Sequence, residues 1–163
     1  MEPELSLTSA TTTVFMDIAA RGESLGRMYI KVFTNRPHGQ QFLMLARGTE
    51  GPTFKGAIFN YKEHDCIELW HYVMENGSLS NAPLLTTLKE EHYEAPARGM
   101  LFPCPLGSID KASFTIMTKD WDLGLMPGYF GNIVEGMNVI DIIASDMYDD
   151  MNQIMITDCG MYN

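Results

Sequence analysis

Apolar and polar positions follow a clear strand pattern near the start of the chain. Residues 14–19 and 28–33 form two runs rich in β-branched and aromatic side chains. The segment RGESLG between the runs supplies turn residues. Two such runs joined by a short turn predict a β-hairpin over residues 14–33.

The segment NRPHGQQFLMLARG, which follows this hairpin, has a helical pattern instead. Pro37 suits a first helical turn, and Gly48 provides a stop. The apolar residues between them lie on one helical face, namely Phe42, Leu45 and Ala46. We therefore expect one short helix here.

A second helical pattern occurs near the end of the chain, in EGMNVIDIIASDM at residues 135–147. Its apolar residues recur at helical spacing. One face holds Met137, Ile140 and Ala144, with Val139 and Ile143 beside it.

Strand patterns outnumber these two helices. ASFTIMT, residues 112–118, places Phe114 and Ile116 on one side, as a half-buried strand does, and QIMITDCG closes the chain as a strand. Residues 54–98 mix short apolar runs with turn residues and give weak signals. The pattern favours a mainly β fold, an antiparallel sheet closed into a barrel with helices over its ends.

Length and charge narrow the class of protein. With 163 residues the chain fits one domain, taken as residues 13–163 after a flexible N-terminal lead-in, residues 1–12. The net charge of −10 disfavours direct contact with nucleic acid and with anionic membranes. The expected partner is another protein or peptide, with the chain monomeric by itself or part of a larger complex.

Three cysteines, Cys66, Cys104 and Cys159, are far apart and odd in number, which does not suit a disulfide framework. They are expected to be reduced thiols in a reducing compartment. No secretory signal or membrane-spanning run is evident in the sequence, so we expect an intracellular protein.

The segment HDC offers His64, Asp65 and Cys66 which, together with His71, could be metal ligands or a nucleophile and base. Their spacing fits no closed zinc pattern, and a loop with solvated histidines is the simpler interpretation. A catalytic Cys66 thiolate would need a nearby cation, such as His64 or Lys62. We expect no metal and no cofactor.

Four segments, VFMDIAARGESLGRMYIKVF, FKGAIF, YFGNIVEGMNVID and ITDCG, resemble the cyclophilins, the cyclosporin-binding peptidyl-prolyl isomerases. The matches occur in the family's order and spacing from Val14 to Gly160. This resemblance implies an eight-stranded antiparallel β-barrel capped by two α-helices.

The resemblance also implies where an active site would lie, and there the chain departs from it. Cyclophilins follow the FKG strand with a run of the form F-H-R-x-x-x-x-F-M-x-Q-G-G-D, whose arginine stabilises the twisted X–Pro amide. This chain reads FNYKEHDCIELWHY instead. Tyr61 takes the place of the arginine, and a neutral phenol cannot replace a guanidinium. Lys62 is adjacent but should point to the opposite face of its strand.

Other groove positions change as well. Cys66 replaces the family's pocket phenylalanine, Ile67 its methionine and Leu69 its glutamine, while Trp70 and His71 replace paired glycines.

The second half of the groove departs in the same way. An alanine and an asparagine that contact substrate fall near Cys104 and Pro105, and the phenylalanine behind the pocket aligns with Thr115. The pocket histidine falls at about Pro127, and Trp121 keeps a groove position.

Together these changes predict a catalytically inactive cyclophilin-like domain, a pseudoenzyme without a catalytic residue, that acts as a protein–protein interaction or scaffold module. The alternative is a peptidyl-prolyl isomerase with weak residual activity on X–Pro bonds, using Trp121 and a rearranged cation such as Lys62. Trp70 and Tyr72 either refill the vacated pocket or form an exposed anchor for a partner. Degenerate cyclophilin domains of nuclear and RNA-processing assemblies suggest a nuclear or cytoplasmic location. The remodelled groove is expected to comprise Tyr61, Cys66, Ile67, Leu69, Trp70, Thr115 and Trp121.

Overall fold

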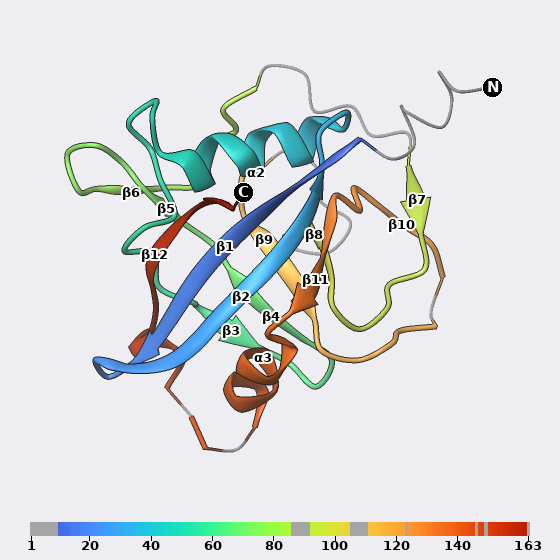
Figure 1. Cartoon of the computed structure of the whole chain (residues 1–163). Coiled ribbons are helices and arrows are strands. Elements are labelled where there is room, and N and C mark those ends of the chain that lie inside the picture. Colours follow the sequence, from blue (N-terminus) through green and yellow to red (C-terminus); the bar gives the residue numbers. More distant parts are fainter. Residues whose placement is uncertain are drawn as a thin grey trace.

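The main feature of the computed structural model is a curled antiparallel sheet of eight strands, with one α-helix above it and one below it in the view of Figure 1. The structure describes residues 10–85, 92–104, 111–122, 124–145, 147–148 and 150–162. In spatial order the strands are β12 (Ile154–Tyr162), β1 (Thr11–Ala20), β2 (Glu23–Phe33), β11 (Gly131–Glu135), β8 (Met100–Pro103), β9 (Phe114–Met117), β4 (Cys66–Leu69) and β3 (Tyr61–Lys62).

Two small sheets and three helices complete the described chain. The small sheets pair β10 (Met126–Pro127) with β7 (Tyr93–Glu94) and β5 (Tyr72–Val73) with β6 (Leu79–Ser80). The helices are α2 (Pro37–Arg47), α3 (Met137–Ala144) and a short 3-10 helix (Met151–Gln153). None of the helices in the described ranges is long and apolar enough to cross a membrane.

The two ends of the eight-stranded sheet meet and close the barrel. The segment just before β3 bonds to the outer edge of β12, where Gly56 N–H donates to the carbonyl of Ile156 at 2.7 Å and Ile156 N–H donates to the carbonyl of Ala57 at 2.9 Å. Phe59 N–H also donates to Ile154, at 2.9 Å. The prediction of a mainly β, eight-stranded antiparallel barrel with two helices is confirmed.

The predicted hairpin is formed by β1 and β2, with a turn shorter than expected. Only Arg21 and Gly22 lie outside the strands, at φ of 52° and 82°. Two consecutive residues at positive φ make the two-residue turn whose twist matches that of paired strands. The rest of the predicted turn, residues 23–26, belongs to β2. β1 begins at Thr11, and residues 1–9 of the predicted lead-in lie outside the described residues.

Helix α2 matches its sequence signals. Pro37 occupies its first turn, and Gly48 ends it in the left-handed conformation at φ 69°, donating its N–H to Met44 at 3.0 Å. The apolar residues predicted for its inner face are all buried, namely Phe42, Leu45 and Ala46.

Helix α3 is shorter than the predicted helical segment, and its buried residues are one from the predicted face and the two predicted to lie beside that face. Val139, Ile140 and Ile143 are buried, whereas Met137 and Ala144 are only partly covered. Of the predicted face, Ile140 is buried and Met137 packs against the main core, whereas Ala144 is only partly covered.

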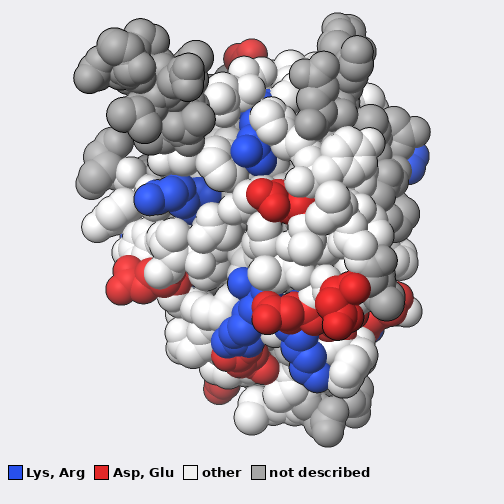
Figure 2. Space-filling model, turned by 90° about the vertical axis from the view of Figure 1, so that its right-hand side faces the viewer, with Lys and Arg blue, Asp and Glu red and all other residues white. Residues whose placement is uncertain are grey.

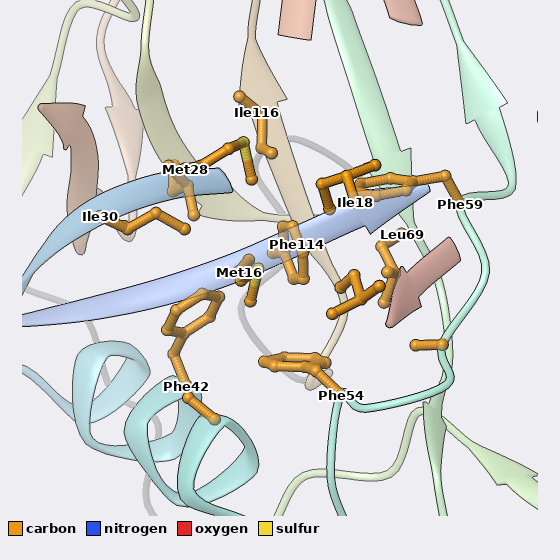
Figure 3. Close-up of a cluster of buried hydrophobic side chains, with 14 of the residues drawn as sticks. Met16, Ile18, Met28, Ile30, Phe42, Phe54, Phe59, Leu69, Phe114 and Ile116 are labelled. Carbon is orange, nitrogen blue, oxygen red and sulfur yellow. The ribbon is translucent and has the colours of Figure 1, made fainter. Parts of the chain in front are cut away.

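The barrel interior is packed with aromatic and branched side chains. Figure 3 shows rings from α2, from the segment before β3 and from β9 turned toward one another. Phe114 of β9 is central, with ring centroids 5.3 Å from Phe42, 5.1 Å from Phe54 and 6.3 Å from Phe59. The prediction that this strand is half-buried is wrong, because all four residues of β9 are buried.

Candidate functional site

The pairing of β4 with β9 decides which side chains face the barrel interior. Ile67 lies opposite Ile116, and Leu69 lies opposite Phe114. Side chains directly opposite in an antiparallel pair share one face, so both β4 residues point into the core. Both are fully buried there. Ile67 and Leu69 therefore cannot line the outer groove, and the expectation for these two residues is corrected.

The other face of β4 and β9 carries a second apolar cluster, hereafter the outer cluster. Cys66 lies opposite Met117, and Glu68 lies opposite Thr115, so these four side chains face away from the main core. The outer cluster consists of buried Cys66, Phe102 and Met117, with Met100, Trp121, Met126 and Tyr129 packed against them.

The outer cluster occupies the part of the barrel where the resemblance places the proline pocket. The rings of Phe102 and Tyr129 are tilted by 37° to each other, with 5.8 Å between their centroids. Cys66 and Trp121 of the predicted groove meet in this cluster, and Thr115 is fully buried on the same face of β9. Phe102 and Tyr129 were not identified from the sequence, although each lies in an apolar run, MLF and YF, that could have signalled burial.

Tyr61 and Trp70 form an exposed aromatic pair beside the outer cluster. Their exposed fractions are 42% and 39%, and their ring centroids lie 6.0 Å apart at an interplanar angle of 33°. The Trp70 indole N–H donates to Glu68 at 2.8 Å, and the Trp70 backbone N–H donates to the Asn60 side chain at 2.7 Å. These contacts hold the indole at the surface.

The side chain of Tyr72, in contrast, is buried. It is 3% exposed within the main core, and its hydroxyl donates to the carbonyl of Ala82 at 2.9 Å. The sequence had left open whether these two aromatic residues are buried or exposed. In the structure Tyr72 fills the core, whereas Trp70 lies at the surface.

Lys62 turns away from the aromatic pair, toward the end of α3. Its ammonium donates to three backbone carbonyls, those of Ile143 at 3.2 Å, Ser145 at 2.6 Å and Tyr148 at 2.6 Å. Carbonyls at the end of a helix lack partners within it, and a cation there also interacts favourably with the helix dipole. The cation nearest to Tyr61 in sequence is therefore committed to a structural role on the far side of its strand.

Replacing this lysine should destabilise the fold. Lys62→Met keeps an unbranched side chain but removes the charge-assisted hydrogen bonds, so we expect a loss of about 2 kcal/mol in the free energy of unfolding. Chemical denaturation monitored by tryptophan fluorescence measures this loss. Lys55→Met is the matched control, because Lys55 has a side chain 63% exposed and only a 3.9 Å ion pair with Asp158. Equal effects of the two substitutions would contradict the role given to Lys62.

The Cys66 thiol is not activated. Burial, followed by the nearby Glu68 and Asp65 carboxylates, raises its pKa to about 12. A thiol with a raised pKa stays protonated and is a poor nucleophile. His64 lies against Lys119, with 3.3 Å between the lysine Nζ and the imidazole Nε2.

The metal interpretation of the HDC segment receives no support. Within the described part of the chain, no three histidine, cysteine or acidic side chains gather in a way that could hold a metal ion.

A mainly apolar pocket of about 260 Å³ lies beside Trp70. Buried Cys104 and Ser113 line it, and the Ser113 hydroxyl donates to the carbonyl of Trp70 at 2.7 Å. Its remaining lining residues are Glu68, His71, Asn81 and Lys111. Burial and the Glu68 carboxylate raise the pKa of the Cys104 thiol, which therefore also stays protonated near neutral pH.

Pro127 and Pro105 also correspond to groove positions of the family. Pro127, at the place of the family's histidine, lies in β10 and pairs with Tyr93. Pro105 lies outside the described residues.

A larger, polar pocket of about 750 Å³ lies between the β3–β4 turn and α3. Its charges largely neutralise each other, since Arg98 holds Asp141 in an ion pair at 2.6 Å and thereby lowers the pKa of that carboxyl. Figure 2 shows acidic and basic side chains close together on the lower part of one face. The surplus of acidic residues therefore does not make this face uniformly negative.

The closed antiparallel barrel with a helix near each end defines the chain as a cyclophilin-like fold. Among solved structures it is similar to the crystal structure of the Mimivirus cyclophilin, with a TM-score of 0.70 over 94% of this chain and 90% of that chain. The two sequences are 20% identical, so the similarity establishes the fold alone. No family model matches the sequence.

Proposed function

We propose that this chain is a cyclophilin-like domain without prolyl isomerase activity, which serves as a protein–protein interaction or scaffold module. The proposal rests mainly on which residue occupies the position of the family's arginine. An exposed, uncharged aromatic residue, Tyr61, stands there, and the adjacent cation, Lys62, is bonded to the end of α3.

The chemistry of X–Pro isomerisation explains why the missing arginine matters. Rotation is slow because the amide must lose its resonance, so a catalyst must stabilise the twisted form. A guanidinium near the imide nitrogen does this in the family that the chain resembles. The Glu63 carboxylate raises the pKa of the Tyr61 phenol, so this ring is neutral near pH 7 and offers a single weak donor.

The packing of the groove supports the same proposal. A proline ring needs an open apolar pocket, whereas the outer cluster already fills this face with side chains of its own, including Phe102 and Met117. A close-packed apolar cluster does not admit a further ring without displacing its own side chains.

Binding to another protein is supported by the exposed aromatic pair. Tryptophan and tyrosine are the residue types most often found at the energetic centres of protein interfaces. Tyr61 lies in β3 of the closed barrel and Trp70 directly follows β4, so a partner would meet them in a fixed orientation. A nuclear or cytoplasmic location and the oligomeric state stay predictions.

The test is to measure the rate of cis–trans exchange of an X–Pro peptide by NMR exchange spectroscopy. We expect the exchange rate with the protein to equal the uncatalysed rate. Tyr61→Arg should also be inactive, because restoring the guanidinium does not empty the outer cluster. Clear acceleration by the unmodified protein, lost on replacing Trp121 with alanine, would instead establish the residual isomerase.

A further inference from the structure

The exposed aromatic pair is accompanied by carboxylates. Glu68 lies directly opposite Tyr61 in the β3–β4 pairing and accepts the hydrogen bond of the Trp70 indole. Glu63, two residues after Tyr61, is the main cause of the raised pKa of the Tyr61 hydroxyl and so lies near it. Two aromatic faces and two acidic groups thus meet in one small area of the surface.

These carboxylates lack cationic partners within the described chain. Neither Glu63 nor Glu68 forms an ion pair with a cation among the residues that the structure places. Lys62 is turned to the other side of its strand by its three carbonyl contacts. Lys111 lines the neighbouring pocket together with Glu68, without an ion pair between them.

Such a surface is suited to a positively charged planar group. A guanidinium stacks on the negative faces of aromatic rings, and it donates in parallel to a carboxylate. Tryptophan is the best aromatic partner for a cation, and Glu68 lies in contact with the indole edge. The net charge of −10 adds long-range attraction for a basic segment.

We propose that Tyr61, Trp70 and Glu68 form a recognition site for an arginine side chain presented by a basic segment of a partner protein. This inference rests on the proposed interaction function and specifies the chemistry of the partner. Cyclophilins carry an arginine at the position of Tyr61. In this chain the surface around Tyr61 is acidic instead, so it would bind an arginine that belongs to another protein.

The experiment uses a short blocked peptide of glycine and serine with one central arginine as the probe. The matched probe has citrulline, which has the same shape but no charge. Each is titrated into the ¹⁵N-labelled full chain at low salt, and the indole N–H signal of Trp70, assigned with Trp70→Leu, reports binding. We expect the arginine peptide to bind about fivefold more tightly, equivalent to about 1 kcal/mol, and raised salt to reduce the difference.

Variants separate the contributions of the site. Glu68→Gln keeps an acceptor for the indole but removes the charge, and Trp70→Leu removes the aromatic face; each should bring the arginine peptide to the affinity of the citrulline peptide. With Trp70→Leu, signals of neighbouring backbone amides serve as the readout. Tyr93→Leu is the control, because Tyr93 is an exposed aromatic residue, at 56%, in a different sheet. It should leave the affinity unchanged.

Several outcomes would overturn the inference. Equal affinity for the arginine and citrulline peptides, absence of any shift at Trp70, or unchanged arginine preference in Glu68→Gln each contradict it. These results are independent of the isomerase assay, which tests the proposed function. A chain that catalyses exchange could still prefer arginine, and an inactive chain could bind neither peptide, so the two failures are distinguishable.

Discussion

Phe114→Ala is expected to lower the free energy of unfolding by about 4 kcal/mol. Phe114 is 1% exposed, and its ring contacts those of Phe42, Phe54 and Phe59 around the centre of the barrel. Truncation removes the buried ring and leaves a cavity bounded by α2, β9 and the segment before β3, which cannot all move inward together. Geometric preferences among aromatic pairs add to the loss.

Urea denaturation of the purified chain measures this effect as a shift of the midpoint at unchanged slope. Tyr93→Ala serves as the control, since it removes an aromatic ring that is 56% exposed and should cost under about 0.5 kcal/mol. A Phe114→Ala midpoint close to that of the control would mean that the ring is not central to the core.

The second large effect is a loss of stability in alkaline solution. Burial raises the pKa of all three thiols, to about 12 for Cys66, to about 11 for Cys159 and in the same direction for Cys104. In the unfolded chain the thiols titrate near the ordinary value of 9.0. Above that pH the unfolded chain releases protons that the folded chain retains, so unfolding becomes more favourable.

The loss of stability begins above the ordinary thiol pKa. Below the ordinary thiol pKa both states are protonated, and the contribution is constant. At about pH 10 each thiol should have removed about 1.4 kcal/mol, or roughly 4 kcal/mol together. Denaturation curves at a series of pH values, compared with those of Cys66→Ala, test this. The variant should lose less stability between neutral and alkaline pH; an identical slope would show that Cys66 does not contribute.

Elements defined by local signals could be predicted from the sequence. The alternation on either side of Arg21 and Gly22 identifies the first hairpin, and Pro37 and Gly48 mark the ends of α2, because turn and cap geometry depends on a few neighbouring residues. The shorter strands β3 to β7 span two to four residues each, too few to establish a period.

The candidate site could be predicted only in part. Tyr61 and Trp70 are both exposed, although the sequence left a buried Trp70 open, and Lys62 points away from Tyr61 as expected from strand alternation. The error at Ile67 and Leu69 arose because the inward face of β4 is determined by its pairing with β9, a strand far away in the sequence. Glu68 between Ile67 and Leu69 agrees with an inward face for these two residues, but a strand of four residues is too short for this alternation to establish it alone.

The closure of the barrel has a consequence for the rate of folding. β12 lies between β1 and the segment before β3, and Thr13 of β1 pairs with Tyr162 of β12. Strands from opposite ends of the described chain must therefore find each other, and the entropy of closing so long a loop is lost before their contacts form. Folding should take milliseconds to seconds, and until β12 is in place both of its neighbours present open edges to other chains.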